Sequence, residues 1–423
     1  MMNLDVTADV TIPQLTGSAA VRSWMATIAL ALVVFASLAN AITTTGAIVA
    51  DDASATPKAY HALLITVGAL LLLRGRIPRL RRELIAYFAI TITTTAFAYV
   101  AYEPRVAGIK LLIALYVAVV ATAVGRTVGH DVAIRACRFA SVAFLLVVTA
   151  KNAMHAPAFL VYLANPFGHP DIPSLAGGGL NLEATWLALS SVFMIGTAWF
   201  VPFTLAAAAT SALYASRAGV VVAGLAVAVA LLRAWTSRPN EAVTVEAPIS
   251  RRSRRRLIIA PILAIGAMAG LTVGFRWVRT YGDATYVAER FATIGEEPGS
   301  LGRATLWRGG LRVFAENPLG VGSGNAVPAL RRTLGVDVPE DNLHNVYLQQ
   351  MVECGIPGLV ALIAFGWATA RRLVRDGFRD PLLLFVGGYL IAGAIQFTGV
   401  DAMLWLVYGL QSGATADAGG NSA

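Results

Sequence analysis

Charged residues are scarce in this 423-residue chain. Asp, Glu, Lys and Arg make up 13% of it, hydrophobic residues make up 57%, and the mean hydropathy is +0.66. Soluble domains usually contain roughly 25% charged residues. Apolar runs long enough to cross ~30 Å of hydrocarbon recur along the whole chain. The composition therefore excludes a soluble globular protein and predicts an all-α polytopic membrane protein.

Cysteine is scarce as well. Cys137 and Cys354 are the two cysteines and fall in different links, which excludes a disulfide framework or a Cys-rich metal site. The segments expected outside the membrane contain no HExxH motif and no His or carboxylate pair at metal-ligand spacing. We therefore expect neither a metal nor a cofactor.

The net charge of +9 comes mainly from arginines in short links between apolar runs, at 74–82, 126–138, 233–256 and 371–379. Basic links of this kind mark the cytoplasmic side of a membrane. Because the charge is spread over these links, it predicts orientation and no nucleic-acid partner.

The alternation of apolar runs with basic links predicts twelve transmembrane helices with both termini in the cytoplasm. The expected spans are 24–42, 59–73, 84–102, 107–124, 139–155, three within 184–236, then 257–278, 357–372, 381–397 and 401–411. We interpret the first as an uncleaved anchor, because the head before it contains Asp5, Asp9 and the single basic residue Arg22.

This map divides the chain into three parts. Residues 1–278 form an N-terminal transmembrane bundle, 279–356 an extracytoplasmic loop, and 357–423 the C-terminal transmembrane helices and a short tail. The other long outer segment, 151–183, reads as an irregular loop because it is rich in Gly and Pro.

An arginine interrupts the apolar stretch 184–236. This stretch leads from an outer segment to an inner basic link, so it must cross the membrane an odd number of times, once or three times. Three crossings fit if the chain breaks at Ser216-Arg217 on the outer face. A charge inside a hydrophobic stretch is costly and is a functional candidate by default. The alternative is that Arg217 only anchors a helix at the interface.

The loop 279–356 contains an amphipathic pattern over 303–314. Apolar residues recur there at helical spacing, while Arg303, Arg308 and Arg312 fall outside the stripe. With Trp307 and Phe314 on the apolar face, the pattern predicts a helix lying at the membrane interface. A solvated face or lipid-headgroup contact is the alternative role for the three arginines.

Asn317-Pro318 ends that helix, and a glycine turn follows at 320–325. It does not fit a dinucleotide site, which needs a strand before it and a helix after it in a βαβ unit. Its glycines instead favour close backbone approach, with free amides that meet an anionic group.

A second helix is expected from Asp341 or Asn342, as N-cap, to a stop and restart at Gly355 and Pro357. It places Asn345, Gln349 and Glu353 on one stripe. His344 falls in its first turn, where the helix dipole favours the neutral, proton-accepting imidazole. A cap or a structural hydrogen bond is the alternative role for this histidine.

Four ordered motifs lie between 302 and 360: Gly302-Arg303-Ala304-Thr305-Leu306-Trp307, Asn317 to Asn325, His344 to Gln349, and Glu353 to Gly358. The series resembles the signature of the O-antigen ligase and Wzy polymerase superfamily. Ser216-Arg217 resembles the Ser-Arg element of that family.

The resemblance implies a metal-independent membrane glycosyltransferase of the GT-C type in the bacterial cytoplasmic (inner) membrane. Such a protein moves a glycan from a polyprenyl (undecaprenyl) diphosphate carrier to an acceptor hydroxyl at the outer face. The acceptor is a glycan, a lipid or a protein, and polysaccharide export or chain-length proteins are possible partners. Arginines that stabilise the diphosphate take the place of a metal ion.

The resemblance implies catalytic roles for His344, Arg217 and Arg303. We expect the substrate-binding residues to be Arg308, Gly322, Gly324, Asn325, Asn345, Gln349 and Glu353. The motifs do not separate a ligase from a polymerase. A twelve-span transporter or flippase of lipid-linked glycan, and a non-catalytic partner in polysaccharide export, are the alternatives from other classes.

Overall fold

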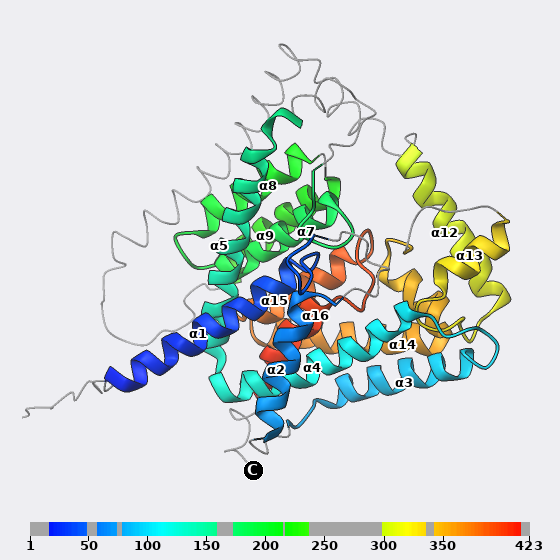
Figure 1. Ribbon diagram of the computed structural model, residues 1–423, viewed down its shortest axis with the longest axis horizontal. Helices are drawn as coiled ribbons and strands as arrows, with labels where there is room; N and C mark the ends of the chain where they lie inside the picture. The colour runs from blue at the N-terminus through cyan, green and yellow to red at the C-terminus, as the bar shows by residue number, and fades with distance from the viewer. Residues whose placement is uncertain are drawn as a thin grey trace, which may run out of the picture.

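The computed structural model describes residues 17–48, 57–73, 78–158, 172–214, 216–236, 298–335 and 342–415, and these residues are helical apart from links and two isolated bridges (Figure 1). The helices are α1 (Gly17–Leu38), α2 (Ala59–Leu73), α3 (Arg82–Ala98), η1 (Val106–Gly108), α4 (Ile109–Val128), α5 (His130–Met154), α7 (Leu180–Ser190), η2 (Ser191–Met194), α8 (Phe200–Leu213), α9 (Arg217–Thr236), α12 (Pro298–Glu316), α13 (Ala326–Leu334), α14 (Val346–Arg375), α15 (Pro381–Ala392) and α16 (Ala402–Ala414). The expected span 257–278, the segment 279–297 and Asp341 lie outside the described residues.

Among the described residues, five helices are long and apolar enough to cross a membrane. They contain Ala20–Leu38, Ile109–Val128, His130–Met154, Arg217–Ala234 and Val346–Arg375, and three shorter apolar helices accompany them at Ala59–Leu71, Phe200–Leu213 and Pro381–Ala392. The prediction of an all-helical polytopic membrane protein is confirmed. The number twelve stays a prediction.

Polar contacts join several helix ends at one end of the bundle, which we call the basic end. Arg372, in the last turn of α14, pairs with Glu83 in the first turn of α3, and the Tyr408 hydroxyl of α16 donates to Glu83 Oε1 at 2.9 Å. His130 Nε2, at the start of α5, lies 3.6 Å from Asp380 Oδ1, which caps α15. All these termini belong to links that the arginine pattern places in the cytoplasm.

The opposite end, which we call the site end, collects the remaining links. The Ala41 amide after α1 donates to Leu175 O before α7 at 2.9 Å, and the Val346 amide at the start of α14 donates to Gly393 O after α15 at 2.7 Å. The path of the chain between the two ends therefore agrees with the predicted alternation.

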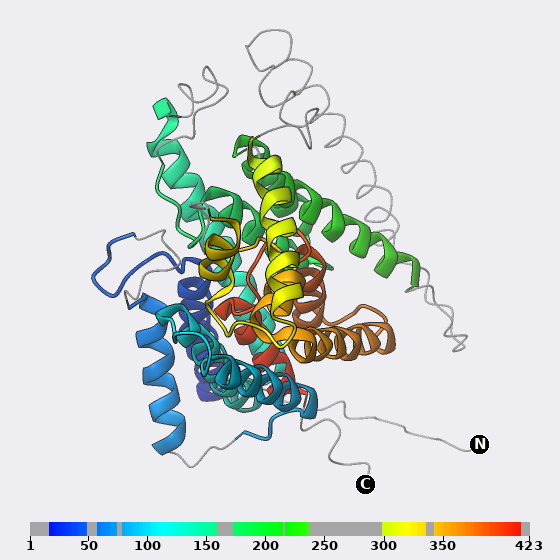
Figure 2. The same ribbon diagram turned by 90° about the vertical axis from the view of Figure 1, so that its right-hand side faces the viewer.

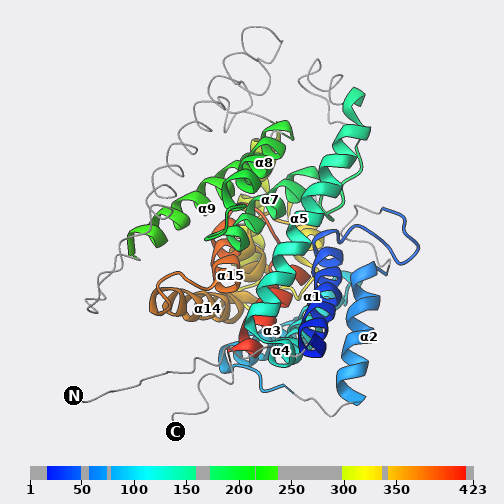
Figure 3. The ribbon, with the colours of Figure 1, turned by 90° about the vertical axis from the view of Figure 1, so that its left-hand side faces the viewer.

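The stretch 184–236 forms three successive passes, α7 with η2, then α8, then α9, which lie together in Figure 3. The first turn-back lies near the basic end, where Arg138 Nε donates to Phe193 O at 2.8 Å. The second lies between the end of α8 at Leu213 and the start of α9 at Arg217. The expected break at Ser216-Arg217 is therefore present.

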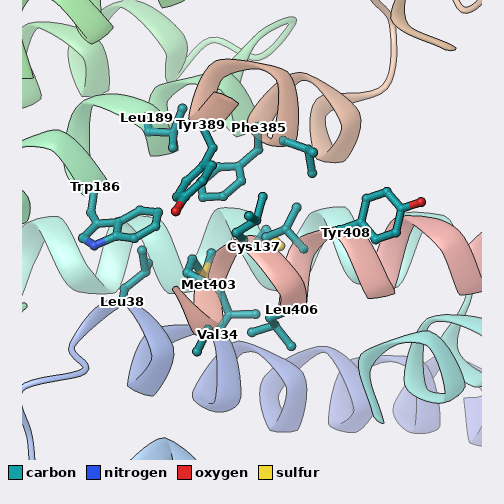
Figure 4. Packing of buried hydrophobic residues seen from close by; sticks show 14 of the residues in the cluster. Val34, Leu38, Cys137, Trp186, Leu189, Phe385, Tyr389, Met403, Leu406 and Tyr408 are labelled. Carbon is teal, nitrogen blue, oxygen red and sulfur yellow. The ribbon is translucent and has the colours of Figure 1, made fainter. Parts of the chain in front are cut away.

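Aromatic rings and small residues pack the bundle. Trp186 of α7 stacks on Phe385 of α15 with ring centroids 6.0 Å apart and an angle of 7° between the planes, and Tyr389 lies on the same side (Figure 4). Between α4 and α16, a Cβ at Gly125 or Gly413 would overlap the backbone of the other helix. Small residues of this kind allow close approach of helices in a membrane.

The two helices α12 and α13 stand beside the first half of α14 (Figures 1 and 2). Leu306 and Val313 of α12 are buried in a second apolar cluster with Leu330, Leu343 and Val352, and Trp307 and Phe314 pack against it. The amphipathic helix is confirmed, but its apolar stripe faces the protein. Residues of α13 and α14 cover that stripe, and the expected position of the helix at the membrane interface stays a prediction.

Candidate active site

The segment before α14 holds His344 in an unusual backbone conformation. Its φ is 50°, in the left-handed region, and its amide donates to Asn342 Oδ1 at 2.8 Å. Asn342 and Leu343 are buried, whereas His344 is only partly buried. A non-Gly residue in this region costs of order 1 kcal/mol and persists only where its surroundings hold it.

The start of α14 differs from the prediction. Its N-cap is Asn345, whose Oδ1 accepts hydrogen bonds from the Tyr347 and Leu348 amides, both at 3.0 Å. His344 therefore precedes the cap and does not lie in the first turn. The argument from the helix dipole loses its basis, since that effect applies within the first turn. Asn345, expected to bind substrate, uses its side-chain oxygen as the cap.

Gln349 and Glu353 lie one turn apart on α14, as the stripe predicted. Gln349 accepts from the Leu343 amide at 2.9 Å and donates to Glu353 Oε1, so it joins the residue before His344 to a buried carboxylate. Glu353 also accepts from the Gly324 amide and the Ser323 hydroxyl. Gln349 therefore connects the His344 segment to the glycine turn.

The glycine turn packs against a break in α14. Gly355 has φ 67°, and Pro357 has no N–H to offer the carbonyl of Glu353. The Gly322 amide takes that place at 2.8 Å, and the Val321 amide donates to Val352 O at 3.0 Å. The expected stop and restart is present, and turn 320–324 supplies the donors that the break leaves missing.

The glycines of this turn allow close approach to its backbone, and the groups that approach it are other residues of the same chain. A Cβ at Gly322 would lie 2.5 Å from the Tyr99 ring, and one at Gly324 would lie 2.7 Å from the Gly108 amide nitrogen. The buried Asn325 amide donates to Glu103 O at 3.1 Å and to Val321 O at 3.0 Å. These contacts give Gly322, Gly324 and Asn325 a structural explanation, and their expected role in binding an anionic group stays a prediction.

A small polar pocket of about 50 Å³ opens beside these residues. Its polar walls come from Asn342, Gln349 and Glu353, together with Lys110 of α4 and Thr398 after α15. Sequence reasoning missed Lys110 and Thr398, because both lie far from the motifs. The available signal was the single cation in the apolar run 107–124.

Arg217 is the first residue of α9 and is half-buried. The Ser216 hydroxyl accepts from the Gly219 amide at 3.2 Å and so caps the helix. Tyr214, at the end of α8, is buried against Glu183. Burial and the neighbouring carboxylate raise the pKa of the Tyr214 phenol far above its usual value, so the group remains a hydrogen-bond donor.

An apolar cavity of about 390 Å³ lies between α9, α14 and α15. Val222 and Leu225, in the second and third turns of α9, line one side, and Tyr347, the second residue of α14, lines another. Arg217 lies five residues before Val222, and His344 lies three residues before Tyr347, whereas the other lining residues of α14 follow its break at Gly355. The three helices lie next to one another in Figure 3.

The arginines of α12 lie on a different element. Trp307 Nε1 donates to Leu343 O at 2.9 Å, which ties α12 to the residue before His344. Arg303, one turn before Trp307, is half-buried, whereas Arg308 is exposed. Arg312 is exposed and pairs with Glu316 at 3.3 Å. Of the three, Arg303 has the placement that best fits a contact near His344.

Within the described ranges, no group of three or more His, Cys, Asp or Glu residues is placed to hold a metal ion. The arrangement therefore consists of a partly buried imidazole, an arginine at a helix start, a polar pocket and an apolar cavity. Such a set suits an amphiphilic, anionic substrate that has a long apolar part.

Residues 202–363 match the sequence model of the O-antigen ligase family, Wzy_C. This stretch, from the first turn of α8 into α14, is therefore similar to O-antigen ligases, and the resemblance inferred from the motifs is confirmed for it. It includes Arg217, Arg303 and His344, whereas Lys110 and Thr398 lie outside it. A search of curated proteins found no match to the chain. The family implies a role in the assembly of surface polysaccharide.

Proposed function

We propose that the protein transfers a glycan from a polyprenyl diphosphate to an acceptor hydroxyl at the outer face of the cytoplasmic membrane. The observation that carries the proposal is that His344 and Arg217 precede two helices that flank one apolar cavity. This arrangement suits a lipid carrier whose charged head lies at the site end and whose tail lies between helices.

In the proposed reaction, the acceptor oxygen attacks the anomeric carbon of the donor sugar. The bond from that carbon to the diphosphate oxygen breaks, and the polyprenyl diphosphate leaves with the electron pair. The proton of the acceptor hydroxyl passes to the His344 imidazole, acting as general base. Arg217, with Arg303, stabilises the negative charge that develops on the leaving diphosphate.

The cavity between α9, α14 and α15 supports this assignment. Its lining residues are almost all apolar, with Tyr347 at the site end and Leu373 toward the basic end. A polyprenyl chain gains free energy from such a surface through close packing, and the tail positions the diphosphate near Arg217. The polar pocket at Glu353 and Lys110 offers hydrogen bonds for sugar hydroxyls next to the His344 segment.

The test uses the purified full-length chain in detergent with undecaprenyl-diphosphate glycan and an acceptor, without ATP, nucleotide sugar or metal. We expect release of undecaprenyl diphosphate and a glycan joined to the acceptor. A ladder of added repeats identifies a polymerase, and a single transfer to a lipid or protein identifies a ligase.

In this assay His344→Ala should lower turnover by at least about 100-fold, as expected for loss of a general base. Donor binding should stay close to that of the parent, because proton removal matters only as the new bond forms. His155→Ala is the matched control: His155 lies at the end of α5 and contacts its own helix at Lys151 O. Full turnover in His344→Ala would contradict the assignment, and lipid-linked glycan that crosses a bilayer without transfer would favour a flippase.

A further inference from the structure

A buried ion pair lies beneath the break that precedes α9. Lys151 Nζ of α5 lies 2.5 Å from Glu183 Oε1 of α7, and the two side chains are 5% and 0% exposed. The Tyr214 hydroxyl contacts the same carboxylate oxygen at 2.7 Å and Asn152 Oδ1 at 2.6 Å. These contacts bring α5, α7 and α8 together at one point.

The second carboxylate oxygen of Glu183 is also satisfied. It accepts from the Leu175 amide at 2.6 Å and from the Ser174 hydroxyl at 3.4 Å. The Lys151 ammonium also lies 5.4 Å from the centre of the Tyr214 ring. We call Lys151, Glu183 and Tyr214 the buried triad. Replacing a buried ion pair by apolar residues is often neutral or stabilising, so a need for stability alone does not explain the triad.

The triad is connected to Arg217 through the backbone. Tyr214 lies three residues before Arg217. Between them, the Ser216 amide donates to Ser211 O at 2.7 Å and the Ser216 hydroxyl contacts Asn181 O at 3.3 Å. The first turn of α9 packs so closely on α8 that a Cβ at Gly219 would overlap the Ser211 side chain. The start of α9 is therefore fixed to both α7 and α8.

We propose that the buried triad positions Arg217 for the donor diphosphate, with Glu183 and Tyr214 acting as positioning residues. This inference rests on the proposed function, since it assumes that Arg217 binds diphosphate. The two parallel hydrogen bonds of a guanidinium demand a defined approach, and a helix start held by both α7 and α8 provides one.

The test measures binding of undecaprenyl diphosphate itself, without a glycan and without turnover, by titration of the purified protein. Tyr214→Phe keeps the ring and removes the hydroxyl, and we expect it to weaken binding about five- to tenfold, the usual value of one hydrogen bond. In an Arg217→Lys background, the same change should cost less than about twofold, because the two residues act as a unit.

Tyr116→Phe is the matched control. This change likewise removes a phenol hydroxyl, but Tyr116 lies on α4 and faces α2, where its partner is the backbone oxygen Leu64 O at 3.0 Å. It should leave lipid binding unchanged in both backgrounds. Glu183→Gln should reproduce Tyr214→Phe, and Tyr214→Phe keeps the test valid if Glu183→Gln fails to accumulate.

An equal loss of binding in both backgrounds would show that Tyr214 acts only on stability, and unchanged binding would overturn the proposal as well. Failure of the unmodified protein to bind the lipid would instead refute the proposed function. The two failures are therefore distinguishable.

Discussion

At the scale of single residues, His344 is positioned almost entirely by its neighbours. Asn342 accepts the hydrogen bond from its amide, Asn345 turns the chain into α14, and Leu343 is fully buried on the side of α12. Because the His344 backbone is in the left-handed region, a change to an ordinary conformation would break one of these contacts. This rigidity is what a group that must meet a reacting hydroxyl requires.

Arg217 and Arg312 offer a comparison at the same scale. Arg217→Lys should lower transfer activity about 10- to 100-fold while the protein accumulates normally, because a single ammonium cannot form the two parallel bonds of a guanidinium. Arg312→Lys should change activity less than about twofold, since Arg312 is exposed and pairs with Glu316. Activity and membrane content are measured together. Equal, mild effects at both positions would reduce Arg217 to an interfacial anchor.

At the scale of elements, the break in α14 and the glycine turn act as one unit. The turn supplies amides to Val352 and Glu353, and the Ile356 amide donates to Pro318 O at 3.1 Å in return. Gly320 has φ 92°, and a Cβ there would overlap the Glu353 carbonyl. The position of Glu353 in the polar pocket therefore depends on the absence of a side chain at residue 320.

Gly320→Ala should destabilise the protein more than Gly335→Ala does. Both glycines have positive φ, so both substitutions cost about 1 kcal/mol for the backbone, but nothing lies within 4 Å of a Cβ at Gly335. Thermal unfolding in detergent should therefore show a larger fall in Tm for Gly320→Ala, together with loss of transfer activity. A fall of equal size in both variants would mean that the turn adapts to the extra atom.

At the scale of the whole molecule, the two ends of the bundle differ in chemistry. The basic end is closed by ion pairs and caps such as Arg372 with Glu83 and Asp380 on α15, whereas the site end carries the polar pocket and the segment with His344. The apolar cavity extends from Tyr347 at the site end toward Leu373 at the basic end. The distribution of arginines predicts that the basic end lies in the cytoplasm.

Thiol labelling of intact spheroplasts checks this orientation. Leu319→Cys, at an exposed residue of the site end, should react with an impermeant reagent from outside, and Arg379→Cys should react only after lysis. The native Cys137 and Cys354 are buried and should contribute little background. Labelling in the reverse order would invert the map and place His344 on the wrong side for a lipid-linked donor outside the cell.

The sequence predicted the features that local patterns determine. The break at Ser216-Arg217 was predicted from the odd number of crossings and from the cost of a charged side chain inside a hydrophobic stretch. The break at Gly355-Pro357 was predicted because glycine and proline interrupt a helix. The cap of α14 was misplaced because Asp341, Asn342 and Asn345 are all good capping residues. The Val346 amide bonded to Gly393 O selects among them, and no local pattern contains that contact.

Long-range partners also explain the other differences. The glycines of turn 320–324 required close approach, but the groups that approach them, such as Tyr99 and Gly108, lie in another part of the chain. The apolar stripe of α12 was visible, but not the surface that covers it. Lys110 and Thr398 reach the polar pocket only because the fold brings α4 and the start of α16 to α14.

The close packing of α16 on α4 has a consequence for the order of synthesis. The ribosome makes α4 early, yet the helix that packs into its glycine surface is the last described one, and Thr398 of the polar pocket lies just before it. During synthesis, α4 is therefore made long before the helix that covers its glycine surface. The polar pocket is complete only once the segment before α16 has been made, so the earlier helices alone cannot form its walls.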